Sequence, residues 1–176
     1  MNKKLQIAVI GSAGPEEYPG KKPNKIMFEA AYLLGQLLAE KNCIVVNGGK
    51  GGIMEAVSRG AKDKNGTTVA EISGSTRYHS NPYIDIEIVS SDIGYRGPSL
   101  LIGMSDAVIA LGGGAGTLQE IAVAYRMKKP TVLLTGFGGW VDRLKSLEYL
   151  DERQLIAFST TTDIESAVIK ALEMVK

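Results

Sequence analysis

The sequence predicts an α/β domain with three layers, a Rossmann-like fold in which helices cover both faces of a mostly parallel sheet of about seven strands. Short runs of Val, Ile and Leu have the pattern of strands that are buried on both faces. Segments with helical spacing alternate with these runs, which implies right-handed crossovers between parallel strands. Because glycine-rich loops follow several strands, we expect a ligand site at the carboxyl edge of the sheet.

The expected elements alternate along the chain. The opening run Leu5–Gly11 is apolar and β-branched and ends in glycine, and Ile26–Glu40 follows it with apolar residues at helical spacing. The expected strands are 5–11, 43–47, 67–71, 84–89, 106–111, 131–134 and 154–158. The expected helices are 26–40, 52–61, a short one from about Pro98 to Met104, 117–127, 140–147 and 163–175. No linker or repeat divides them, so we expect a single domain over residues 1–176.

Composition argues against several functional classes. Hydrophobic residues make up 44% of the 176 residues and charged residues 22%, as in a globular protein. The formal net charge of +1 gives no global field that would attract nucleic acid or a membrane surface. With one His, His79, and one Cys, Cys43, we expect neither a metal site nor an intramolecular disulfide. Since we find no secretory signal and no apolar stretch of about 20 residues, we expect a cytoplasmic protein.

The strongest functional signal is the loop GGGAGTLQE, Gly112–Glu120, between an expected strand and an expected helix. Glycine allows positive φ and a close approach of the backbone to a ligand, and the first N–H groups of the helix form an anion site with its dipole. A second loop, NGGKGG at 47–52, has the same strand-to-helix position, and GSAG at 11–14 follows the opening strand. The residues expected to bind the ligand are Gly11, Ser12, Gly48, Gly49, Lys50, Gly51, Gly113, Gly114, Gly116 and Thr117.

None of these loops carries the GxGxxG fingerprint of dinucleotide sites or the Lys-Ser/Thr of a P-loop, which disfavours NAD and Mg-ATP. A mononucleotide or a sugar phosphate fits better, and we expect no cofactor. A glycine-rich turn taken alone can simply relieve crowding. The prediction of a phosphate site therefore depends on the three loops together.

Thr117 and Glu120 have a competing structural interpretation, because Thr-x-x-Glu is also the capping box of a helix start. The same spacing recurs at Thr162 and Glu165, with no glycine-rich loop before it, and there we expect a plain cap. The spacing alone is therefore uninformative. What distinguishes Glu120 is its position one turn beyond GGGAG.

At these residues the sequence resembles the LOG family, once labelled lysine-decarboxylase-like, whose best-known members are cytokinin riboside 5′-monophosphate phosphoribohydrolases. The family signature PGGxGTxxE reads GGGAGTLQE here, with Gly112 in place of the leading proline. The resemblance covers nearly the whole chain. It is closest to a branch of small proteins akin to molybdenum cofactor carrier proteins, which shares the NPY turn at Asn81–Tyr83 and the GGW-x-DR segment at Gly138–Arg143.

The resemblance implies roles for two residues. In the hydrolases the Glu of the signature and an upstream Arg are implicated in cleaving the N-glycosidic bond, and Glu120 matches the first of them. Arg96 is the candidate for the second, although it stands ten residues before Asp106 where the family has nine, and no second basic residue follows it. A carboxylate beside C1′ could stabilise the positive charge that develops on the sugar, while the glycine loops hold the 5′-phosphate.

Functions of different classes remain open. The chain is either a phosphoribohydrolase of a purine nucleoside 5′-monophosphate, with Glu120 and Arg96 catalytic, or a carrier of a phosphorylated ligand such as the pterin of molybdenum cofactor. A metabolite-sensing module with a protein partner is the third alternative. The resemblance also implies a homodimer or a larger homo-oligomer. His79 and Arg77 share the polar loop STRYHSNPY, for which a solvated surface is the favoured interpretation of His79, and Lys50 is a better candidate for the site.

Overall fold

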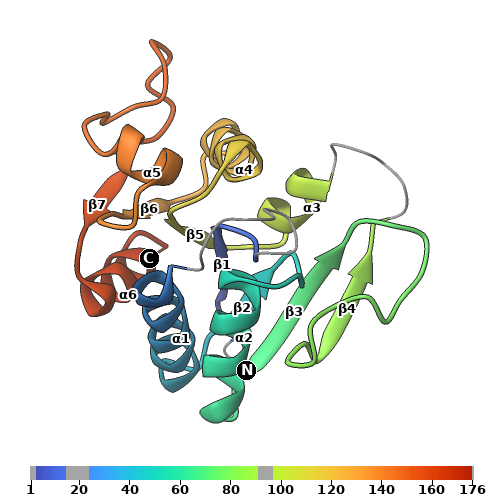
Figure 1. The fold of residues 1–176 in the computed structure, drawn as a ribbon. Coiled ribbons are helices and arrows are strands. Elements are labelled where there is room, and N and C mark those ends of the chain that lie inside the picture. The colour runs from blue at the N-terminus through green and yellow to red at the C-terminus, as the bar shows by residue number, and fades with distance from the viewer. Residues whose placement is uncertain (1–2, 15–23, 91–96, 176) are drawn as a thin grey trace.

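The computed structural model describes residues 3–14, 24–90 and 97–175. At its centre lies a sheet of seven parallel strands in the order β4-β3-β2-β1-β5-β6-β7 (Figure 1). The strands are β1 (Gln6–Gly11), β2 (Ile44–Asn47), β3 (Thr67–Ile72), β4 (Ile86–Val89), β5 (Ala107–Leu111), β6 (Thr131–Leu134) and β7 (Ser159–Thr161). The expected α/β fold with a parallel sheet is confirmed. The strand order reverses beside β1, which lies between β2 and β5, and such switch points are where parallel sheets bind ligands.

Helices cover both faces of this sheet. Their bounds are α1 (Lys25–Glu40), α2 (Ile53–Asp63), α3 (Gly97–Gly103), α4 (Ala115–Arg126), α5 (Gly139–Leu144) and α6 (Ile164–Glu173). In Figure 1, α1, α2 and α6 lie on one face of the sheet and α3, α4 and α5 on the other. The molecule therefore has the three layers that the alternating pattern predicts.

The side chains of successive strand residues point alternately to the two faces of the sheet, as the pleat requires. Ile7 and Val9 of β1 pack in the core beneath α1, α2 and α6, whereas Ala8 and Ile10 pack in the core beneath α3, α4 and α5. The interior strands are therefore apolar on both faces over most of their length. This explains why they read as continuous runs of Val, Ile and Leu rather than as alternating patterns.

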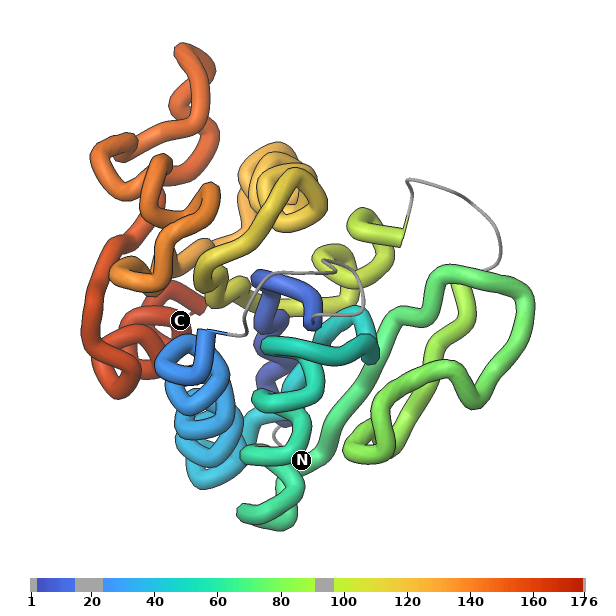
Figure 2. The backbone as a smooth tube through the Cα atoms, viewed as in Figure 1, coloured from blue at the N-terminus to red at the C-terminus, as the bar shows by residue number. Residues whose placement is uncertain are grey.

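The last strand is not where the sequence predicts it. The apolar run 154–158 is irregular, and β7 begins one residue after it, at Ser159. The run serves the core in another way: Phe158 stacks on Tyr125 with ring centroids 5.9 Å apart, and the Leu155 N–H donates to the Tyr125 hydroxyl at 3.0 Å. Figure 2 shows the segment between α5 and β7 looping out before it returns to the sheet. Because these apolar residues cover Tyr125, they are not available to pair with β6.

Two helix starts also differ from the predictions. The helix α4 begins at Ala115, two residues before the expected Thr117, and Gly114 is its N-cap. At α6 the N-cap is Asp163, whose carboxylate accepts the Ser166 N–H at 2.7 Å, so the cap lies one residue beyond the expected Thr162. In the described part of the chain, no helix is both long and apolar enough to cross a membrane.

Candidate functional site

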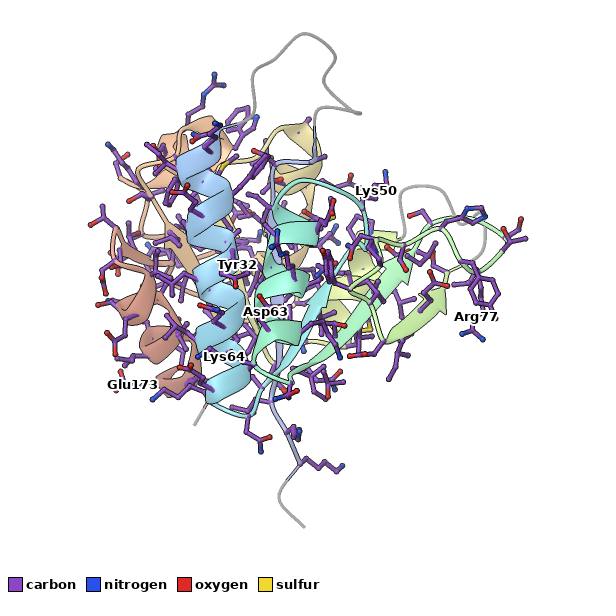
Figure 3. All side chains as sticks on the ribbon, turned by 60° about the horizontal axis from the view of Figure 1, so that its bottom comes forward. Tyr32, Lys50, Asp63, Lys64, Arg77 and Glu173 are labelled. Atoms are coloured by element: carbon purple, nitrogen blue, oxygen red, sulfur yellow. The ribbon has the colours of Figure 1, made fainter. Side chains whose placement is uncertain are left out.

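The three glycine loops meet at the carboxyl edge of the sheet, around the end of β1 (Figure 2). Beside them lies a cavity of about 190 Å³. The predicted residues that line it are Gly11, Gly48, Lys50, Gly114, Gly116, Thr117 and Glu120. Figure 3 shows Lys50 on the loop that leads into α2, far from Arg77. The other predicted residues within the described ranges, Ser12, Gly49, Gly51 and Gly113, do not line this cavity.

Ser12 joins the other two loops to its own. Its hydroxyl oxygen accepts the Gly113 N–H at 2.9 Å, and its carbonyl oxygen accepts the Ile53 N–H at 3.1 Å. A second link runs from the Thr117 hydroxyl, which donates to the Gly11 carbonyl oxygen at 3.1 Å. The bonds to Gly113 and from Thr117 connect segments about a hundred residues apart in sequence. Ser12 therefore acts as a structural connector of the site, which a local sequence pattern does not reveal.

Two glycines of the third loop have different reasons to be glycine. Gly113 has φ +88°, and a Cβ there would lie only 2.4 Å from the Thr117 side chain. Gly116 has no such constraint: its backbone is not in the left-handed region, and a Cβ would meet no atom within 4 Å. Since Gly116 lines the cavity, the space that its missing side chain leaves belongs to the cavity. Gly113 is thus required by the fold, whereas Gly116 keeps the cavity open.

The start of α4 faces this space without a side-chain cap. Gly114, the N-cap, has no side chain, and no side-chain hydrogen bond caps this helix within the described residues. Thr117 lies inside the first turn and its hydroxyl is bonded to Gly11, so Thr117 and Glu120 do not form a capping box. The first N–H groups of α4 and the positive end of its dipole are therefore directed at the cavity.

The second loop is held by side chains that the sequence analysis did not single out as functional. Asn47 is fully buried, and its side-chain oxygen accepts the Gly49 N–H at 2.7 Å. From the β3–β4 connection, the Asn81 side-chain amide donates to the carbonyl oxygens of Gly49 and Lys50 at 3.1 and 3.0 Å. The NPY turn thus clamps the loop that presents Lys50. An Asn at the head of a Pro-containing turn is the signal that could have indicated this role.

The first turn of α5 and the loop before it support the third glycine loop. The N–H groups of Trp140 and Val141 donate to the carbonyl oxygens of Gly113 and Gly112, at 2.9 and 3.2 Å. Asp142 fixes this loop in turn, because its carboxylate accepts the N–H groups of Gly136 and Gly138, both at 2.8 Å. The GGW segment is therefore part of the scaffold of the site.

The cavity contains a second carboxylate, Glu71, which the sequence analysis missed. Glu71 is the penultimate residue of β3, 5% exposed, and shares a face of that strand with Val69, toward α3 and α4. Burial first, and then the negative charge of Glu71, raise the pKa of Glu120 to about 8, against the opposite effect of Lys50. Glu120 therefore holds a proton at neutral pH. A charged residue inside the apolar strand TTVAEI was the available signal, because carboxylates are seldom fully buried without a role.

Other sequence candidates lie elsewhere. His79 is exposed and contacts the Thr76 hydroxyl at 2.8 Å. Arg77, on the same loop as His79, lies near Tyr78 and near Glu87 of β4. Neither residue lines the cavity. Arg96 falls outside the described residues. Within the ranges that the structure describes, no group of three or more His, Cys, Asp and Glu residues could hold a metal ion.

Fold and site together define a Rossmann-like domain with a cavity built by glycine loops at the sheet switch point. The chain belongs to the SLOG cluster4 family, whose model matches residues 4–170. An uncharacterized protein from Archaeoglobus fulgidus is 38% identical over 140 residues, which cover 76% of this chain and 86% of that protein.

Solved structures are similar over nearly the full length. The X-ray structure of TM1055 has 30% identity and a TM-score of 0.86, covering 97% of this chain and 99% of the other. The molybdenum cofactor binding protein of Rippkaea orientalis has 27% identity and a TM-score of 0.80, with 99% of both chains covered. The molybdenum cofactor carrier protein of Chlamydomonas reinhardtii has 27% identity and a TM-score of 0.79, with 98% of both chains covered. The resemblance to a LOG-like branch near the carrier proteins is thus confirmed.

Proposed function

We propose that this chain is a cytoplasmic binding or carrier protein for a small phosphorylated ligand, a nucleoside monophosphate or a phosphorylated pterin. The observation that carries the proposal is the uncapped start of α4, which faces the cavity at Gly114 and Gly116. Helix N–H groups and the helix dipole favour a phosphate at such a position, and Lys50 adds a positive charge on the cavity wall. The similarity to proteins named as molybdenum cofactor binding or carrier proteins supports the same function.

The substitution Gly116→Val tests this proposal. A Cβ at this position meets no atom of the protein within 4 Å, so the variant should fold, but its side chain would occupy the space of the ligand. We expect the affinity for AMP and for inorganic phosphate, measured by calorimetry, to fall at least about tenfold, equivalent to about 1.4 kcal/mol. Unchanged affinity in a folded Gly116→Val protein would remove α4 from the phosphate site.

A phosphoribohydrolase is the second candidate, supported by the position of Glu120 in the cavity about one turn beyond the phosphate site. In this reaction the C1′–N bond breaks and the leaving base takes up a proton. The oxygen of water bonds to C1′ and that water gives up a proton, which restores the acid. Since Glu120 is protonated at neutral pH, it is suited to donate that proton. Arg96 would hold the phosphate or the ribose, and the negative charge of Glu71 would face the developing positive charge on the sugar.

Base release separates these two functions. Wild type and Glu120→Gln are incubated with a panel of nucleoside 5′-monophosphates, and free base is followed by chromatography. The hydrolase predicts slow release from at least one purine monophosphate by wild type and none above background by the variant. If wild type binds these ligands or a phosphorylated pterin but releases no base, the carrier function stands and the hydrolase is excluded.

A homo-oligomer is part of the proposal. The outer surface of α1 exposes Ile26 at 71% and Leu33 at 41%, and Phe28 lines a groove with Ala56 of α2. Exposed apolar side chains such as Ile26 and Leu33 favour packing against a second copy. We expect light scattering at micromolar concentrations to give at least twice the chain mass of 18.8 kDa. A mass of one chain across this range would contradict the expectation.

A further inference from the structure

Glu71 is a buried carboxylate in the cavity that a phosphate site does not require. Its side chain lines the cavity together with Lys50, Gly116 and Glu120, and it is only 5% exposed. A negative charge here disfavours the phosphate itself, so it must face a different part of the ligand. Burying a charged group is also unfavourable unless hydrogen-bond donors surround it. The hydrogen-bond donors around Glu71 therefore determine how much of its acceptor capacity is left for a ligand.

Among the described residues, two neutral hydroxyl groups donate hydrogen bonds to the Glu71 carboxylate, and both bind the same oxygen. Ser90 and Ser73 both donate to Oε1, at 2.5 and 3.4 Å. Gly97 at the start of α3 comes so close that a Cβ there would lie 2.9 Å from Oε1 and 3.1 Å from Oε2. An ionised carboxylate offers about four lone-pair sites, of which these hydroxyl groups use two. Within the part of the chain that the structure describes, both hydroxyl groups bond to Oε1, so acceptor capacity at Oε2 remains for a ligand.

Glu120 lies near Glu71 and can donate a hydrogen bond where Glu71 can only accept one. Its carboxyl group is close enough to Glu71 for the charge of Glu71 to favour its protonated form, and at neutral pH it carries a hydrogen that it can donate. The pair thus presents acceptor sites on Glu71 next to a donor on Glu120. A ligand that matches this arrangement has N–H donors beside a carbonyl oxygen.

The spacing along α4 leaves room for a sugar between the two ends of such a ligand. Ala115 begins the helix and Glu120 lies five residues further, which corresponds to about 7.5 Å along the helix axis. A phosphate at the helix start is therefore separated from the carboxyl pair by roughly the width of a ribose or pyran ring. The ring system attached to that sugar would then reach Glu71.

We propose that Glu71 selects the ring of the ligand, and that the cavity prefers a phosphorylated ligand whose ring edge presents an amino group, a ring N–H and a carbonyl in a row. Guanine and pterins share this edge. The two adjacent N–H donors would share Oε2 of Glu71, and the Glu120 hydroxyl would donate to the carbonyl oxygen. Adenine has a ring nitrogen acceptor where guanine has its N–H, no amino group beside it, and an amino group in place of the carbonyl. It therefore loses both bonds to Glu71 and places an acceptor against a carboxylate. This inference rests on the proposed phosphate site.

Calorimetric titrations of wild type with GMP, IMP, AMP and ribose 5-phosphate at one ionic strength test the inference without any variant. IMP keeps the ring N–H and the carbonyl of GMP but lacks the amino group. We expect GMP to bind at least about tenfold more tightly than AMP, with IMP between them. Ribose 5-phosphate has no base and reports on the phosphate site alone. If AMP binds as tightly as GMP or more tightly, the inference is wrong.

The variant Glu71→Gln assigns the selectivity to this residue. A Gln side chain offers one acceptor and one donor, the pattern that pairs with adenine, so the GMP preference should disappear or reverse. A tenfold preference that persists in the variant would overturn the role of Glu71.

The two proposals fail in different ways: if ribose 5-phosphate does not bind wild type, or binds Gly116→Val equally well, the phosphate site fails. If ribose 5-phosphate behaves as expected while GMP and AMP bind alike, only the role of Glu71 fails.

Discussion

The starts of α4 and α6 solve the same problem in different ways. Each helix begins with backbone N–H groups that lack partners within the helix. At α6 the Asp163 carboxylate accepts the Ser166 N–H at 2.7 Å, and this bond lowers the pKa of Asp163. At α4 the N-cap is Gly114, the nearest carboxylic acid on the helix is Glu120, and the pKa of Glu120 is raised.

This difference separates a structural helix start from a functional one. An ionised carboxylate that satisfies its own helix contributes to folding and leaves the N–H groups occupied. A glycine cap leaves them directed at the cavity, and the protonated Glu120 adds no charge that would repel a phosphate.

The largest effect is expected for Gly113→Ala. Alanine at φ +88° is strained, and its Cβ would lie 2.4 Å from Thr117, which also holds Gly11. We expect the free energy of unfolding to fall by about 3 kcal/mol in denaturant titrations. A loss below about 1 kcal/mol would show that the loop does not need its glycine conformation.

A pH-dependent effect should follow from Glu120. In the unfolded chain its pKa is near 4.5, whereas in the folded protein it keeps its proton up to about pH 8. Its contribution to stability is complete below pH 4.5 and is lost as the pH rises through about 8, with a slope of up to about 1.4 kcal/mol per pH unit. Glu120→Gln has no such titration. Between pH 5 and 8, wild type should therefore lose about 3 kcal/mol relative to the variant, and parallel pH curves would contradict the raised pKa.

A smaller effect is expected for Asp163→Ala, which removes the cap of α6. The free energy of unfolding should fall by about 1 kcal/mol near neutral pH. Because the pKa of Asp163 is lowered by the Ser166 N–H, the stabilisation is present above the ordinary pKa near 3.8 and disappears below it. Phosphate affinity, measured by calorimetry, should not change. A weakened affinity would mean that the contrast between the two helix starts is not local.

Local sequence patterns predict much of this architecture, for physical reasons. Glycines that end apolar strands reveal the loops around Gly11, Gly48 and Gly114, and the run of residues after the third loop reveals Glu120. Both signals depend on neighbours in sequence. The predicted range of the last strand, 154–158, is wrong because an apolar run that covers Tyr125 has the same composition as a buried strand.

The remaining features depend on contacts between distant segments. Glu71 becomes part of the cavity only when β3 is parallel to β2 and α4 crosses the same face. Asn81 clamps the second loop from more than thirty residues away, and Ser12 holds the third from about a hundred. A prediction from local pattern could mark these residues as polar groups in unusual places, but it could not assign their partners.

The phosphate site at the start of α4 is tested most directly by Gly116→Ala, with Gly103→Ala as the matched control. Both glycines lie within helices, have no positive φ and accept a Cβ without a close contact, but only Gly116 lines the cavity. Alanine should leave stability unchanged or raise it by up to about 1 kcal/mol in both proteins. Calorimetry with inorganic phosphate should show weaker binding for Gly116→Ala and wild-type binding for Gly103→Ala. Equal phosphate affinity in all three proteins would contradict a phosphate site at the start of α4.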